Sequence, residues 1–147
     1  MQLKNKFINH SSCKFEENIS NMKSFYESSI MISDWSGAAI EYALGLEKPV
    51  IFVDVPRKVH NLNYEDISQV PIEVMLRQEV GEVISPDDLL DIPAAVERLC
   101  KNPEDWKLRL RGLRSQWVYN IGKSAETMAD HIANVSESAE ANIKEAR

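Results

Sequence analysis

A strand–helix–strand pattern near the N-terminal third constrains the fold of this chain more than any other feature. Residues 29–33 form a short apolar run that suits a buried strand. Residues 50–53 are β-branched and aromatic, which favours a second buried strand. Residues 36–46 lie between them and have a helical pattern that ends ahead of Pro49. Two strands and a helix within about 25 residues predict a parallel βαβ unit with a right-handed crossover.

The rest of the chain predicts an α/β domain that continues into helices. We expect an irregular N-terminal segment over residues 1–18, a Rossmann-like nucleotide-binding domain over 19–135, and a polar helical or frayed tail over 136–147. A long loop over 54–70 precedes a third strand at 81–85, and helices are expected over 21–28, 87–100, 103–119 and 124–135. About three strands can be counted, whereas a complete doubly wound sheet has about five or six. We therefore expect the chain to lack preceding βα units, or alternatively a partner to complete the sheet.

Composition excludes several classes of function. The net charge of −6 argues against bulk electrostatic binding to nucleic acid or anionic lipid. Cys13 and Cys100 lack CxxC spacing, so we interpret them as reduced thiols and not as a disulfide or metal pair. The N-terminus resembles no signal peptide, and no apolar run approaches the ~20 residues of a spanning helix. These features predict a cytoplasmic protein without metal or cofactor, whose membrane contact, if any, is peripheral at the inner face.

Residues 33–45, Ser-Asp-Trp-Ser-Gly-Ala-Ala-Ile-Glu-Tyr-Ala-Leu-Gly, are the most informative stretch. They follow the carboxyl end of a strand and begin a helix, the edge at which open α/β sheets bind ligands and helix N-termini bind phosphate. Ser36 is a good helix N-cap and Gly37 permits close approach to the backbone, so both are candidates to contact a diphosphate. The alternative is that Ser36 only caps the helix. Asp34 is expected to support the loop by bonding to backbone amides, or to favour the helix dipole.

Glu41 is the second candidate of this helix. Its neighbours are apolar nearly all round, so we expect a buried helix, in which a carboxylate is costly unless it is paired or meets a ligand. Glu41 lies four residues after Gly37 on the same helix face, from which it could accept hydrogen bonds from two ribose hydroxyls. The alternative is a glutamate paired to an arginine or exposed at the surface. In the loop after the next strand, Arg57 and Lys58 are candidates to reach a donor phosphate, unless they are ordinary surface charges.

A later segment, Asn120-Ile-Gly122-Lys-Ser124, contains Gly-Lys-Ser but is not a P-loop. The full P-loop pattern requires glycine five residues before Gly122, and Trp117 stands there. Ser124 remains a helix N-cap that we expect to face the same cleft and to contact donor phosphate.

Residues 33–43 followed by Glu-Lys-Pro-Val-Ile-Phe at 47–52 resemble the CDP-glycerol glycerophosphotransferase family of teichoic-acid and capsule synthesis. The segment at 120–124 is similar to a second feature of that family, and the shorter Ser-Gly, Glu, Lys-Pro pattern is also similar to UDP-sugar enzymes. The resemblance implies the C-terminal half of a two-Rossmann (GT-B) transferase. It further implies a nucleotide-activated donor such as CDP-glycerol, a polymer or lipid-linked acceptor, and a separate N-terminal half.

By this resemblance, Ser36 and Gly37 contact phosphate and Glu41 contacts ribose. The family's catalytic histidines lie in the N-terminal half and in a His-Pro motif. None of the three histidines in this chain is followed by proline; the pairs are His10-Ser11, His60-Asn61 and His131-Ile132. No catalytic residue is therefore assigned. Two other hypotheses stay open: a non-catalytic fragment or interaction module of the same fold, and a flavodoxin-like regulator with Asp34 as acceptor carboxylate.

Overall fold

The computed structural model describes residues 2–18, 21–57, 59, 61 and 63–145. The chain divides into two compact units, Met1–Leu110 and Arg111–Arg147. The first unit holds a sheet with its helices, and the second is helical. The domain bounds expected from the sequence, 19–135, stay a prediction.

The sheet confirms the expected α/β class. β1 (Met31–Ser33), β2 (Val50–Val53) and β3 (Gly81–Ile84) form a three-stranded parallel sheet in the order β1-β2-β3. Ser33 is paired with Phe52, and Val53 is paired with Ile84. The first two strands flank α3 (Gly37–Leu46), as the βαβ pattern predicts. The three strands end together at one edge of the sheet because they run in the same direction.

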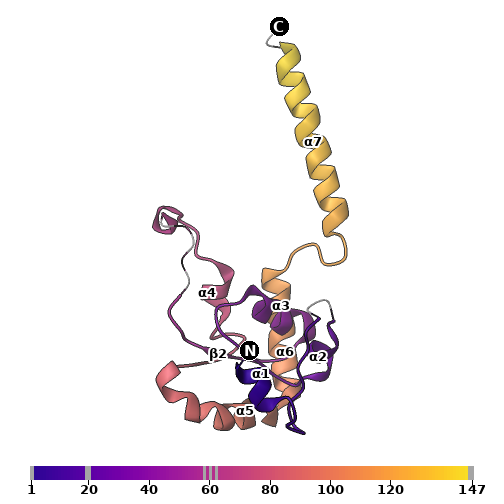
Figure 1. Cartoon of the computed structure of the whole chain (residues 1–147). Coiled ribbons are helices and arrows are strands. Elements are labelled where there is room, and N and C mark those ends of the chain that lie inside the picture. The colour runs from indigo at the N-terminus through magenta and orange to yellow at the C-terminus, as the bar shows by residue number, and fades with distance from the viewer. Residues whose placement is uncertain (1, 19–20, 58, 60, 62, 146–147) are drawn as a thin grey trace. The chain divides into compact units, whose positions relative to one another are not determined.

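Helices cover both faces of the sheet because side chains alternate along each strand. On one face, α5 (Ile92–Lys101) packs Ala95 and Leu99 against Ile51 and Ile84. α3 packs against β1 and lies on the side of the sheet opposite to α5 (Figure 1). The apolar residues of α3 that lie in the core are Ala39, Ile40, Tyr42, Ala43 and Leu44. A sheet covered on both faces explains why β2 reads as a continuous apolar run.

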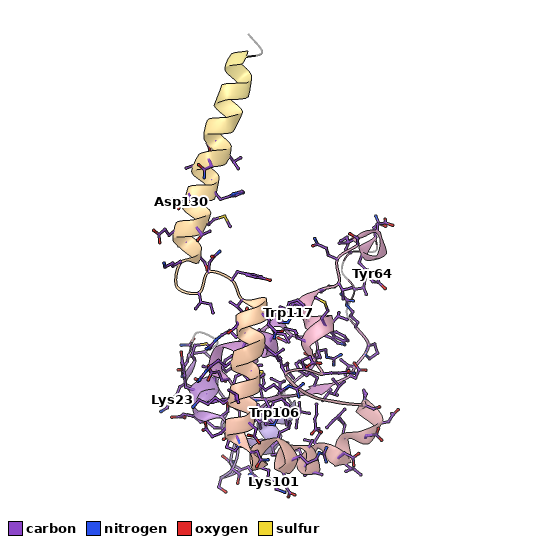
Figure 2. All side chains as sticks on the ribbon, turned by 180° about the vertical axis from the view of Figure 1, so that it is seen from behind. Lys23, Tyr64, Lys101, Trp106, Trp117 and Asp130 are labelled. Atoms are coloured by element: carbon purple, nitrogen blue, oxygen red, sulfur yellow. The ribbon has the colours of Figure 1, made fainter. Side chains whose placement is uncertain are left out.

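The connection from β2 to β3 contains two elements that the sequence did not predict. A long loop projects from the sheet, and Tyr64, which opens the 3₁₀ turn η1 (Tyr64–Asp66), lies at its far end (Figures 1 and 2). The chain then returns through the short helix α4 (Ile72–Leu76). α4 packs against α3, so it brings its side chains close to the start of that helix.

The remaining elements are helical. α1 (Gln2–Phe7) lies where an irregular segment is predicted, so that expectation is wrong for these six residues. α2 (Lys23–Glu27) precedes β1, and the 3₁₀ helix η2 (Pro86–Asp91) leads from β3 into α5. α6 (Pro103–Trp117) follows α5 and places Trp106, labelled in Figure 2, against the cluster that Ala95 and Leu99 of α5 form with β2 and β3. α7 (Ser124–Glu145) lies in the second unit and extends into the predicted tail as far as residue 145.

Candidate functional site

The carboxyl edge of the sheet carries most of the candidate residues. Trp35, Ser36 and Gly37 follow β1, and Asp54 and Arg57 follow β2. α4 adds side chains that approach this edge from the connection between β2 and β3. Segments that are far apart in sequence therefore meet where parallel sheets bind ligands.

The first turn of α3 has the conformation that the sequence predicts. Ser36 is the N-cap, with φ −130° and ψ 128°, and its carbonyl accepts the Ala39 N–H at 3.1 Å. The Ser36 hydroxyl forms no capping bond, and Gly37 and Ala38 are exposed. The hydroxyl and the exposed start of the helix are consequently placed to meet an anion.

A carboxylate already lies beside this turn. Glu73 on α4 places Oε1 3.6 Å from the point where a side chain at Gly37 would begin. A negative charge at this position suits the positive end of the helix dipole. A phosphate that approaches Gly37 would therefore be repelled by the negative charge of Glu73. Nothing in the sequence of the α4 segment indicates that Glu73 lies beside Gly37.

Trp35, and not Asp34, fastens the loop after β1. The indole Nε1 of Trp35 donates to the carbonyl of Val55 at 2.8 Å, which joins the loop after β1 to the loop after β2. Asp34 is exposed, and its side chain has no hydrogen bond or ion pair within the described residues. The expected bonds from Asp34 to backbone amides are therefore not seen in this part of the chain, and the alternative, a charge that favours the helix dipole, stays a prediction. The larger indole reaches across to the loop after β2, whereas the side chain of Asp34 is exposed.

Arg77, directly after α4, is a buried charge at this edge that sequence reasoning missed. The residue is 5% exposed, and its Nη1 donates to Asp54 Oδ1 at 2.7 Å. Its guanidinium carbon lies 3.8 Å from the centre of the Trp35 ring and 5.1 Å from that of Phe52. Nε and Nη2 are buried and have no hydrogen-bond partner among the described residues. The local sequence Leu-Arg-Gln-Glu is mostly polar and predicts an exposed segment. The burial of Arg77 therefore depends on the packing of α4 and cannot be predicted from these residues.

Arg57 connects the edge of the sheet to a small cavity. Its guanidinium carbon lies 5.8 Å from the Trp35 ring centre and 5.5 Å from the Tyr64 ring centre. The adjoining cavity of about 240 Å³ is lined by Arg57, Tyr64, Ile67, Gln69, Val70 and Pro71. Arg57 is exposed, so it remains a candidate to reach a phosphate, as the sequence predicts. Lys58 lies outside the described residues.

The expected burial of Glu41 is wrong. Glu41 is exposed, together with Gly37, Ala38 and Gly45. These four residues recur at helical spacing and form the outer face of α3. Glycine and alanine count as apolar in the sequence, but their small side chains lose little by facing water. The argument from a costly buried acid therefore fails, although an exposed carboxylate between small residues is open to a ligand.

Ser124 is the remaining predicted phosphate contact. It begins α7 in the second unit, and its hydroxyl donates to the carbonyl of Asn120 at 2.9 Å. The turn before it contains two residues with positive φ, Asn120 at 54° and Gly122 at 78°. The role of Ser124 in phosphate binding stays a prediction.

The lysine of the Lys-Pro motif has a structural role. The Lys48 ammonium donates to the carbonyls of Tyr26 and Ser28, both at 2.7 Å, and to that of Phe25 at 3.3 Å. It therefore satisfies carbonyls at the carboxyl end of α2, where a positive charge is favoured. Lys48 also lines a cleft of about 290 Å³ together with Glu27, Ser28, Ser29, Pro49, Leu99, Cys100 and Pro103.

Tyr42 completes the packing of α2 on α3. Its hydroxyl lies 3.0 Å from Ser28 Oγ, and its ring meets Phe25 edge to face at 5.7 Å between ring centres. Burial raises the pKa of Tyr42 above its ordinary value, and the hydrogen bond with Ser28 opposes part of that rise. These contacts join α2 and the residue after it to α3.

No helix among the described residues is both long enough and apolar enough to cross a bilayer. The chain was also compared with protein-family models, curated proteins and solved structures, and none of them matched.

Proposed function

We propose that the chain binds the diphosphate of a nucleotide-activated donor, CDP-glycerol or a UDP-sugar, at the carboxyl edge of its sheet. In this proposal it is the donor-binding part of a GT-B transferase that moves glycerophosphate or a sugar to a polymer or lipid-linked acceptor. The observation that carries the proposal is the exposed first turn of α3, in which the Ser36 hydroxyl forms no cap. The resemblance of residues 33–52 supplies the donor class.

Each candidate residue has a distinct part in the proposed site. The start of α3 at Ser36 and Gly37 accepts the phosphates through backbone N–H groups and the hydroxyl. Arg57 adds a positive charge from the loop after β2. Glu41 lies one turn further along the exposed face of α3, where a ribose could bond to its carboxylate. The ribose contact now rests on the resemblance and on access from solvent, and no longer on burial.

The residues present suit binding and orientation more than proton transfer. The edge contains arginines, carboxylates and backbone donors, and none of the three histidines follows the family's His-Pro pattern. In the proposed transfer these groups hold the donor diphosphate while a base from elsewhere activates the acceptor hydroxyl. The charges that stabilise the leaving nucleotide are therefore the part that this chain contributes.

Titration of the chain with CDP, CDP-glycerol and UDP-sugars tests this proposal. Tryptophan fluorescence is a suitable signal because Trp35 lies within the site, and the Trp35→Phe variant identifies its contribution. We expect saturable binding of at least one of these ligands, with AMP as the matched control for a nucleotide of another class. Binding of all ligands no tighter than that of AMP at millimolar concentration would contradict the proposed function.

A further inference from the structure

The guanidinium groups of Arg98 and Arg77, both in the first unit, differ in whether their paired donors have an acceptor. Nε and Nη2 lie along one edge of the planar guanidinium and form a pair of parallel donors. In Arg98 this pair holds both carboxylate oxygens of Glu82, with Nε to Oε1 at 3.2 Å and Nη2 to Oε2 at 2.6 Å. In Arg77 the same two nitrogens are buried and have no partner among the described residues.

The surroundings of Arg77 hold its guanidinium in place. Asp54 accepts from Nη1, and the rings of Trp35 and Phe52 lie against the guanidinium. Trp35 is itself fixed by its hydrogen bond to the Val55 carbonyl. The guanidinium is therefore held in one orientation before any ligand reaches it.

A buried, unpaired donor is unfavourable, so native proteins seldom leave such groups without an acceptor. One Asp54 oxygen cannot serve the opposite edge of the guanidinium. Two parallel donors fit two oxygens of one tetrahedral or planar oxyanion, which is the geometry by which arginine reads phosphate and carboxylate. The Trp35 ring lies against the guanidinium, and Trp35 directly precedes Ser36, the N-cap of α3, in the sequence.

We propose that Arg77 is the oxyanion receptor of this site and binds a phosphate group through Nε and Nη2. The inference deepens the proposed function by naming the residue that receives a donor phosphate. Glu73, one helical turn before Arg77 and adjacent to Gly37, is the competing negative charge. Entry of phosphate requires the side chains that cover Arg77 to move, and it places the anion between the guanidinium and the start of α3.

The test uses the whole chain, inorganic phosphate as the probe, and constant ionic strength. The readout is the ¹H–¹⁵N signal of the Arg77 Nε–H group, with thermal unfolding as a second measure. Arg77→Lys keeps the charge beside Asp54 but removes the paired donors. Arg98→Lys is the matched control, since it makes the same change at an arginine whose donors already have an acceptor. Glu73→Gln removes the competing charge and keeps Arg77.

We expect phosphate to shift the Arg77 Nε–H signal saturably and to raise the unfolding temperature. Arg77→Lys should weaken phosphate binding by at least about tenfold, as expected when a two-donor contact becomes a point charge. Arg98→Lys should leave phosphate affinity unchanged, and Glu73→Gln should raise it by about two- to fivefold, a repulsion screened by solvent. If Arg77→Lys does not fold, the signal of the unmodified chain and the Glu73→Gln variant decide the question.

An Arg77 signal that does not respond to phosphate overturns the inference, as does phosphate binding that Arg77→Lys leaves intact. The two proposals fail in different ways. Phosphate binding that depends on Arg77, without preference for CDP- or UDP-linked ligands over AMP, upholds the receptor and removes the donor class. Binding of CDP-glycerol that is the same in Arg77→Lys upholds the donor site and removes the receptor.

Discussion

Replacement of Gly81 by alanine adds only one methyl group, yet we expect it to lower the stability of the chain strongly. Gly81 is the first residue of β3, is buried, and is paired with Val50 of β2. A Cβ added there would lie 1.7 Å from the Val50 carbonyl oxygen and 2.6 Å from its carbonyl carbon. These are backbone atoms, so no side-chain rotation relieves the overlap. Replacement of Gly81 by alanine must separate β2 from β3.

The cost of Gly81→Ala can be estimated from that separation. Forcing an extra methyl into a packed site costs about 1–3 kcal/mol, and each backbone hydrogen bond that is lost adds about 0.5–1.5 kcal/mol. The bond from Val50 N–H to the Val80 carbonyl, at 3.1 Å, lies directly at this point. With this one bond lost, we expect Gly81→Ala to lower the free energy of unfolding by about 1.5–4.5 kcal/mol, a large part of the roughly 5–15 kcal/mol that folded domains have.

The same substitution at Gly45 is the matched control. Gly45 lies on the exposed face of α3, and a Cβ there would have no neighbour within 4 Å. Alanine has the higher helix propensity, so Gly45→Ala should raise stability by about 0.5 kcal/mol or slightly more. Urea unfolding followed by far-ultraviolet circular dichroism and tryptophan fluorescence measures both variants. A Gly81→Ala protein within 1 kcal/mol of the unmodified chain, on the ~1 kcal/mol scale of ordinary substitutions, would refute the reasoning.

Three further substitutions test separate parts of the structure. Lys48→Met should lower stability by about 1–3 kcal/mol in the same urea assay because three carbonyls lose a charged donor. Lys101→Met, at an exposed position, is the control and should change stability by less than about 0.5 kcal/mol. Tyr42→Phe should reduce the loss of stability in alkaline solution. Because folding raises the pKa of Tyr42, its contribution is complete below the unfolded pKa of about 10 and is lost as pH rises through the folded value; unfolding curves as steep in pH for the variant as for the parent would contradict this. Glu41→Ala should leave stability within about 0.5 kcal/mol, weaken nucleotide binding by about 1–3 kcal/mol, and leave binding of inorganic phosphate unchanged by calorimetry; equal loss for both ligands would show that Glu41 does not read the ribose.

Local patterns predict the βαβ unit well because each of its parts is self-sufficient. β2 is observed at residues 50–53, where a β-branched and aromatic run is bounded by proline on one side and aspartate on the other. α3 begins after Ser36, the predicted cap, and the residues that follow it are good helix formers. These features depend on neighbours in sequence, so they can be read without knowledge of the tertiary structure.

Burial of charged residues could not be read in the same way. Glu41 has apolar neighbours in sequence, yet it is exposed because the side chains next to it on the helix surface are small. Arg77 has polar residues after it, yet it is 5% exposed because Trp35 from the loop after β1 and Phe52 from β2 lie against it. Both errors have one cause. Exposure depends on the helix face and on the packing partner, and a linear stretch of sequence reports neither.

The motif that begins α3 combines two physical tasks that the sequence alone does not separate. Trp35 joins the loops after β1 and β2 and forms one wall around Arg77, so its role is to position other groups. Ser36 and Gly37 leave the start of the helix open, which in the proposed site would admit a ligand. Change at Trp35 should therefore disturb Arg77 and Val55 together, whereas change at Ser36 should affect only what binds at the helix. In the proposed site, one aromatic ring thus holds the charge in place, and two small residues leave the start of the helix open to the ligand.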